Sequence, residues 1–158
     1  IDLGEQVAAN LATLSVAVSP ATHPSTGVPF FELPDDEMEI GMGQHGEAGV
    51  GRMKMKSANE TADIMFNQLL KDLEVKSGDK LVVQLNGTGA TTLMELFIIF
   101  RRISQIMEEK GIVLAGTRIG ELLTVQEQGG FQMSIGRVDD RLLELWKAPC
   151  GAVYYTVN

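Results

Sequence analysis

The sequence is poor in several residues that would mark a specialised class of protein. Its 158 residues include one cysteine, Cys150, so an internal disulfide is excluded and we expect a reducing compartment, the cytoplasm. Aromatic residues make up 6% of the chain, so the core has to be built mainly from Leu, Ile, Val and eight Met. No stretch approaches the roughly 20 apolar residues of a membrane helix. The chain starts at Ile1 without a signal-peptide pattern, and we expect it to begin inside a longer protein.

Positive charge is also scarce. Lys and Arg number 13 against 21 Asp and Glu, which gives a formal net charge of −8. A nucleic-acid-binding protein needs a basic face to neutralise phosphates, and an anionic membrane surface attracts basic segments. The length suits one compact domain with a buried core. We therefore expect a single domain over residues 1–158, with neither nucleic acid nor membrane as a partner.

Hydrophobic periodicity predicts helices and strands in mixed order. Residues 20–35 hold four of the five prolines and are expected to form an extended loop. Ser57 and Glu60 are spaced as a helix capping box, and Gly111 is expected to end a long helix. The expected strands are 14–18, 38–43, 80–85, 112–123 and 131–138, and the expected helices are 2–14, 58–73, 91–110 and 140–146. This order is not a strict strand–helix alternation, so it predicts an α/β fold with a mixed β-sheet and helices packed on it.

One segment, Gly41-Met42-Gly43-Gln44-His45-Gly46-Glu47-Ala48-Gly49, is dense in glycine around a histidine. Glycine allows positive φ and close approach by a ligand, so His45 is expected on an open turn. Imidazole can act as an acid, a base, a metal ligand or a nucleophile, and Glu47 is near enough in sequence to orient it. The alternative interpretation is a surface turn without a chemical role. Zinc has little support, because His23 lies in a loop beside Pro24 and Cys150 is remote.

A second segment, residues 86–92 (Asn-Gly-Thr-Gly-Ala-Thr-Thr), joins an expected strand to an expected helix. Such a loop can gather free N–H groups at the positive end of a helix dipole, which is an anion site. It is not a P-loop, because Gly-Lys-Ser/Thr is absent, and of the Rossmann fingerprint only Gly87-x-Gly89 is present. A tight turn without a ligand is an equally good interpretation.

Residues 33–47 resemble the L-x-x-x-E-M-E-x-G-x-G-I-H-G-E signature of dihydroxyacetone kinases. The resemblance continues in order, since residues 86–91 are similar to the family's N-N-L-G-A-T. Residues 139–149 are similar to its D-D-x-x-L-x-L-x-x-A-P ending. The similarity covers essentially the whole chain, which it identifies as the C-terminal half of the substrate-binding subunit.

This resemblance implies a function and a set of roles. The family's equivalent of His45 forms a covalent hemiaminal with the ketone carbon of dihydroxyacetone, and Gly43, Gly46 and Glu47 become the substrate-binding residues around it. The phosphoryl donor, Mg-ATP or a tightly held ADP recharged by a phosphotransferase protein, is expected on a separate helical nucleotide-binding domain or subunit. No cofactor or metal ligand is expected in this chain. The family is dimeric, which implies a homo-oligomer.

The sequence also departs from the family pattern. Gln44 replaces the usual Ile and Ala48 the usual Pro. The family's N-terminal G-G-G-S-G-H-E-P loop, with the Asp that activates the substrate hydroxyl, is not among residues 1–158. We therefore expect the N-terminal half of the subunit as a partner and no kinase activity from the isolated chain. Two alternatives stay open: a non-catalytic ketose-binding sensor or co-regulator, and a kinase for a related sugar such as erythrulose.

Overall fold

The computed structural model describes residues 2–43, 49, 51–123, 125–153 and 155–157, which form the mixed α/β fold expected from the sequence. The helices are α1 (Asp2–Ala9), α2 (Ala58–Asp72), α3 (Leu93–Lys110) and α4 (Asp140–Lys147). The strands are β1 (Leu11–Ser19), β2 (Glu37–Ile40), β3 (Gly51–Lys54), β4 (Lys80–Gly87), β5 (Val113–Gly120), β6 (Gly129–Arg137), β7 (Cys150–Gly151) and β8 (Thr156–Val157).

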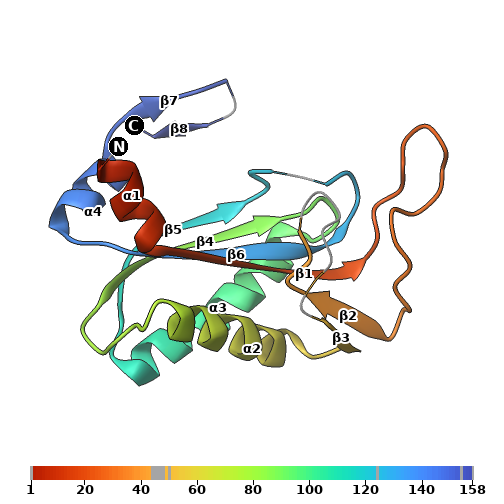
Figure 1. Cartoon of the computed structure of the whole chain (residues 1–158), viewed down its shortest axis with the longest axis horizontal. Coiled ribbons are helices and arrows are strands. Elements are labelled where there is room, and N and C mark those ends of the chain that lie inside the picture. The colour runs from red at the N-terminus through yellow and green to blue at the C-terminus, as the bar shows by residue number, and fades with distance from the viewer. Residues whose placement is uncertain (1, 44–48, 50, 124, 154, 158) are drawn as a thin grey trace.

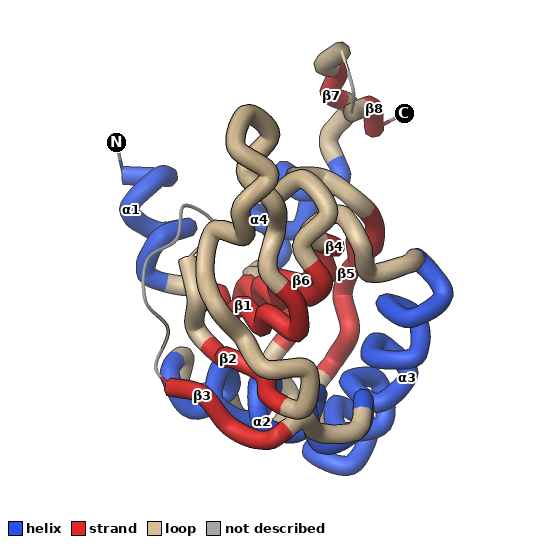
Figure 2. Tube along the Cα trace, turned by 90° about the vertical axis from the view of Figure 1, so that its right-hand side faces the viewer, coloured by secondary structure: helices blue, strands red, loops and turns tan. Residues whose placement is uncertain are grey.

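The first six strands form one sheet in the order β3-β2-β1-β6-β4-β5. Only β4 and β5 pair in parallel, and every other pair within this sheet is antiparallel. Helices α2 and α3 cover one face of the sheet, while α1 and α4 lie on the other side at one end (Figure 1). Seen along the strands, the loops gather at the end of the sheet that faces the viewer (Figure 2). The face opposite α2 and α3 is called the open face below.

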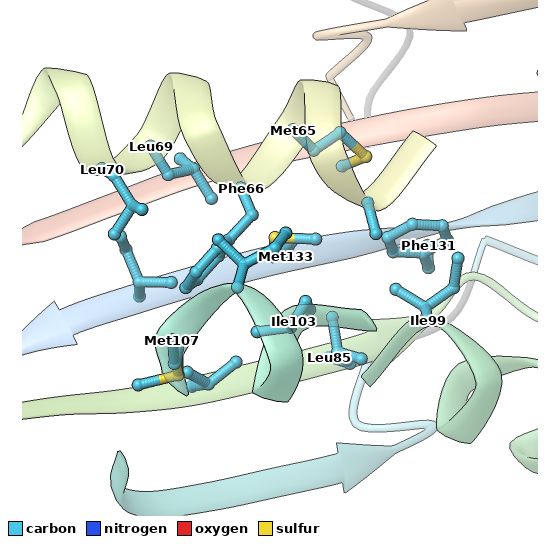
Figure 3. Packing of buried hydrophobic residues seen from close by; sticks show 14 of the residues in the cluster. Met65, Phe66, Leu69, Leu70, Leu85, Ile99, Ile103, Met107, Phe131 and Met133 are labelled. Carbon is cyan, nitrogen blue, oxygen red and sulfur yellow. The ribbon is translucent and has the colours of Figure 1, made fainter. Parts of the chain in front are cut away.

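The core lies between the sheet and the pair of helices α2 and α3. Figure 3 shows side chains of both helices meeting those of β4 and β6, among them Phe66, Ile103 and Met133. On β6, Phe131, Met133 and Ile135 point into this core, and the intervening Gln132 and Ser134 lie on the open face. The expected reliance on aliphatic residues and Met is confirmed, since four Met are at most 2% exposed: Met38, Met65, Met107 and Met133.

Local sequence signals set the ends of the two long helices. Ser57 and Glu60 form the expected capping box at the start of α2, and Thr92 and Glu95 form a second at the start of α3. In each box the side chains and backbone N–H groups of the two residues bond reciprocally, which satisfies donors that a helix start leaves free. Gly111 ends α3 in the left-handed conformation with φ 65°, as expected.

The N-terminal expectation is wrong in part. Periodicity predicted a helix over 2–14, but α1 ends at Ala9, and Leu11 to Leu14 belong to β1. The Asn10 side chain donates to the Gln6 carbonyl at the helix end, and the residues beyond pair with β6 from Leu11↔Gly136 onward. Leu11 and Leu14 have a helical spacing, but their pairing with β6 makes them part of a strand. Strand β3 was also not expected.

The C-terminal segment contacts the sheet through Arg118 of β5. Its guanidinium lies 4.6 Å from the ring centroid of Tyr155 and 5.7 Å from that of Trp146. Cation–π contacts of this kind are attractive, so they hold the β7–β8 hairpin beside α4. No helix within the described ranges is long and apolar enough to cross a membrane.

Candidate functional site

Residues 44–48, called the histidine segment below, lie between described residues. Gln44, His45, Gly46, Glu47 and Ala48 lie outside the part of the chain that the structure describes. Gly43 is described as half-buried at one end of this segment, and Gly49 is half-buried at the other. The positions of these two ends therefore define where the segment attaches to the fold.

The first end is held by Ser15 of β1. Its carbonyl accepts the N–H of Gly41 at 2.7 Å, and its hydroxyl donates to the carbonyl of Met42. In β1, Ala12, Leu14, Val16 and Val18 pack toward the core, so Ser15 between them is on the open face. The chain that leads to Gly43 is therefore attached on the open-face side of β1.

The second end is held by Glu39 of β2, which is 7% exposed. One carboxylate oxygen accepts the N–H of Gly49 at 2.9 Å, and the other accepts Nε of Arg52 in β3 at 3.2 Å. Met38 and Ile40 on either side of Glu39 are buried in the core, so Glu39 also projects toward the open face. Both ends of the histidine segment are thus fixed on the same face of the sheet.

The loop at 86–92 is built around a buried amide. Asn86 is 1% exposed, and its Oδ1 accepts the N–H groups of Leu122 and Leu123 at 2.7 and 2.9 Å. Its Nδ2 donates to the Leu123 carbonyl at 2.7 Å. These three bonds tie the end of β4 to the segment that follows β5.

The same loop bonds to the start of β6, which answers the anion-site hypothesis in part. The N–H of Thr88 donates to Gly130 O, and the N–H of Ala90 to Gln128 O. The N–H of Thr92 donates to the Glu95 carboxylate at 2.8 Å. These three N–H groups already have acceptors within the protein. The loop is therefore better interpreted as a structural turn than as an anion site.

The proline-rich loop at 20–35 reaches the same end of the molecule. The backbone N–H of Thr22 donates to the Glu127 carboxylate at 2.8 Å, and this hydrogen bond lowers the pKa of Glu127 below its ordinary value. His23 lies in this loop, where Nδ1 is 3.0 Å from the hydroxyl of Ser25. Within the described ranges, no group of three His, Cys, Asp or Glu is placed to hold a metal ion, and Cys150 is exposed.

Sequence reasoning missed Ser15 and Glu39. The available signal was the alternation Met38-Glu39-Ile40, in which a carboxylate separates two core residues. That pattern places Glu39 on the second face of the sheet but does not tell which N–H group it accepts. The contact to Gly49 follows only from how the chain returns to β3, whose register pairs Glu39 with Arg52.

The chain is similar to several known proteins. The Dak1 domain family matches residues 1–154. The dihydroxyacetone-binding subunit DhaK of the PTS-dependent dihydroxyacetone kinase 2 of Listeria innocua is 33% identical over 98% of this chain and 46% of its own length. The L-erythrulose kinase of Pectobacterium atrosepticum is 33% identical over 96% of this chain and 26% of its own.

A solved structure, the dihydroxyacetone kinase operon co-activator Dha-DhaQ, superposes with a TM-score of 0.85 at 26% identity, covering 94% of this chain and 46% of that one. The chain spans about half the length of the dihydroxyacetone-binding subunit that it matches. Since the family match runs through nearly every residue, from the first helix to the C-terminal hairpin, this chain belongs to the Dak1 domain family.

Proposed function

We propose that this chain is the C-terminal half of the substrate-binding subunit of a kinase for dihydroxyacetone or a related short-chain ketose. One observation carries the proposal: relatives named as dihydroxyacetone-binding subunits match it at 33% and 36% identity over nearly its whole length. The G-x-H-G-E sequence of the family signature stands intact at Gly43 to Glu47. The whole protein's activity also requires the half that these 158 residues do not include.

In this proposal His45 binds the substrate covalently. The unprotonated ring nitrogen of a neutral imidazole attacks the ketone carbon, a C–N bond forms and the C=O π bond opens. The proton on the other ring nitrogen leaves, and the alkoxide oxygen gains one, so the adduct contains the whole ketose and nothing is released. The bond fixes the position of a small, flexible substrate, which is how a binding site lowers the entropic cost of the following reaction. Gly43, Gly46 and Glu47 surround the substrate in this arrangement.

The test is adduct formation with dihydroxyacetone labelled with ¹³C at the ketone carbon. On mixing with the complete subunit, in which the N-terminal half is also supplied, we expect a new ¹³C resonance of a tetrahedral carbon, together with a mass increase of one intact ketose. His45→Ala should abolish both signals, and His23→Ala, the matched control, should leave them unchanged. An adduct that survives in His45→Ala, or a complete wild-type subunit that never forms one, would refute the proposed role of His45.

A second candidate function has its own support. The co-activator structure named above has the same fold at 26% identity, so this fold also serves in a protein named for regulation. A sensor would bind the ketose as this kinase half does but would transfer no phosphoryl group. With its N-terminal half and a helical nucleotide-binding subunit supplied, the kinase should convert the ketose to its phosphate with Mg-ATP or a phosphotransferase donor. Ketose binding without turnover under both conditions identifies the sensor.

The choice of ketose is a further part of the proposal. Relatives at about the same identity are named for dihydroxyacetone and for L-erythrulose. The two sugars share the ketone carbon and one hydroxymethyl arm, so His45 chemistry does not distinguish them. Competition between the labelled dihydroxyacetone adduct and unlabelled erythrulose gives their relative affinities directly.

A further inference from the structure

Glu39 is a buried carboxylate in a position where the fold alone does not need one. It belongs to a strand whose other face supplies Met38 and Ile40 to the core, and it sits opposite Ala17 of β1. Burying a carboxylate is unfavourable unless its oxygens are paired or hydrogen-bonded. Both oxygens of Glu39 accept hydrogen bonds, one from Gly49 and one from Arg52. Glu39 therefore has two partners, whose contributions can be separated.

The two partners differ in kind. Arg52 has a side chain that is 47% exposed, whereas that of Glu39 is 9% exposed, so Arg52 balances the charge of a buried carboxylate from the solvent side. Gly49, in contrast, is the first described residue after the histidine segment, and it donates a backbone N–H to the carboxylate at 2.9 Å. A hydrogen bond from a backbone N–H to a charged acceptor is stronger and shorter than one between neutral groups.

Gly49 is also fitted closely to this contact. A Cβ on Gly49 would lie 2.6 Å from the Ile40 carbonyl oxygen and 2.9 Å from Oε1 of Glu39. Glycine therefore lets the returning chain lie directly against β2 beside the carboxylate. The other end of the segment has its own attachment through Ser15, to Gly41 and Met42.

We propose that Glu39 is a positioning residue that fixes the returning end of the histidine segment on the open face by binding the Gly49 N–H. The inference rests on the proposed function, because its consequence is the affinity of His45 for a ketose. Misplacing a reacting group by about 1 Å can cost about a hundredfold in a reaction that depends on geometry. Removing the acceptor at Glu39 therefore weakens the adduct, whereas removing Arg52 does not.

The experiment compares Glu39→Ala, Glu39→Gln and Arg52→Ala in the complete subunit, with ¹³C-labelled dihydroxyacetone as the probe. Glu39→Ala should free the Gly49 amide, seen as faster hydrogen exchange, and weaken adduct formation about ten- to a hundredfold. Glu39→Gln keeps an oxygen acceptor of the same reach and should stay within a few-fold of wild type on both readouts. Arg52→Ala removes the charge partner of a buried carboxylate and should lower stability, but it keeps the acceptor of the Gly49 N–H. Its affinity for the ketose should therefore stay within a few-fold of wild type, which separates the Gly49 contact from the ion pair.

Two results separate this inference from the proposed function. If wild type forms no adduct, the proposed function fails, and with it any effect of Glu39 on ketose binding. If wild type forms the adduct and Glu39→Ala binds the ketose equally well, only the role of Glu39 is overturned. Should Glu39→Ala fail to fold, Gly49→Ala supplies the same test from the other partner, because its Cβ displaces the chain from β2 while the carboxylate remains. An unchanged affinity in folded Gly49→Ala would also overturn the proposal.

Discussion

Asn86 shows how a single buried amide holds two loops together. Its Oδ1 and Nδ2 satisfy three backbone groups of Leu122 and Leu123 and have almost no contact with water. A buried group that loses its partner costs about 1–3 kcal/mol, and this applies fully to the Asn86 amide, whereas the groups on Leu123, which is 58% exposed, can reach water. We therefore regard Asn86 as a structural residue and not as a ligand for an anion.

Replacing Asn86 should destabilise the domain strongly. Asn86→Ala removes three hydrogen bonds, of which those to Leu123 can be replaced by water, and we expect the free energy of unfolding to fall by about 1–3 kcal/mol. Asn67→Ala is the matched control, since Asn67 is exposed on α2 and donates one bond to the Asp63 carbonyl. That variant should stay within about 0.5 kcal/mol of wild type. Urea unfolding measures both, and equal effects would contradict the assignment.

The sequence indicated the candidate reactive residue of the site, but not the residues that hold its segment on the sheet. His45 was found because its neighbours match a family signature, yet the site roles of His45, Gly46 and Glu47 lie outside the described residues and stay predictions. Ser15 and Glu39 were missed for a physical reason. Their contacts require β1, β2 and β3 to be paired in register, and no local pattern encodes that pairing.

At the scale of elements, the helices with local signals were predicted well. The second and third helices begin at capping boxes whose residues are three apart in sequence, and Gly111 marks one end. The strand character of Leu11 to Leu14 was missed because it depends on β6, more than a hundred residues away in the chain. Short strand β3 was missed as well, although its partner β2 is its neighbour in the chain.

The capping boxes predict a stability that falls on acidification. The hydrogen bonds from Ser57 lower the pKa of Glu60, and those from Thr92 lower the pKa of Glu95, both below the ordinary 4.5. A carboxylate whose pKa is lowered by folding stabilises the native state above the unfolded pKa, and this is lost as the pH falls through the folded one.

The free energy of unfolding should therefore decrease between about pH 6 and about pH 3. Thr92→Ala should cost about 1 kcal/mol at neutral pH and reduce the acid dependence, because Glu95 then keeps only the bond from the backbone N–H of residue 92 and its pKa is lowered less. Denaturant curves at several pH values provide the measurement. An acid dependence that is identical in Thr92→Ala and wild type would show that the box does not contribute.

The two faces of β6 should respond differently to truncation. Ile135 is fully buried in the core, and Ile135→Ala should cost about 2–5 kcal/mol through lost burial and the cavity left behind. Ser134, its neighbour on the open face, bonds only the hydroxyl of Thr13 at 2.8 Å. Ser134→Ala should cost no more than about 1 kcal/mol. Comparable losses in the two variants would mean that the open face is as tightly packed as the core.

For the molecule as a whole, we expect the exposed edge strand β5 to determine whether the chain self-associates. Strand β5 has no neighbour on its outer side in the part of the chain that the structure describes, and Val113 and Leu114 on it are 47% and 40% exposed. Exposed edges tend to be covered or paired. We expect the chain to self-associate through this edge when its other half is absent.

Light scattering should show a mass above the monomer that falls towards it on dilution. Thr117→Lys, a charge on the exposed part of β5, should shift this equilibrium to the monomer, whereas Gln68→Lys on α2 should not. A stable wild-type monomer at high concentration would contradict the prediction.

The isolated chain should also show no ketose-dependent consumption of ATP, since the proposed hydroxyl-activating half is not within it.

The central place of β6 has a consequence for how the chain acquires its structure. It is the strand that joins β1 on one side to β4 on the other, yet it is the last of the six to be synthesised. A nascent chain that ends before Gly129 holds two groups of strands with no common partner. Sheets dominated by such distant pairings fold on the scale of milliseconds to seconds. The domain therefore completes its core only after nearly all of it has left the ribosome, and until then its apolar strand faces need protection from aggregation.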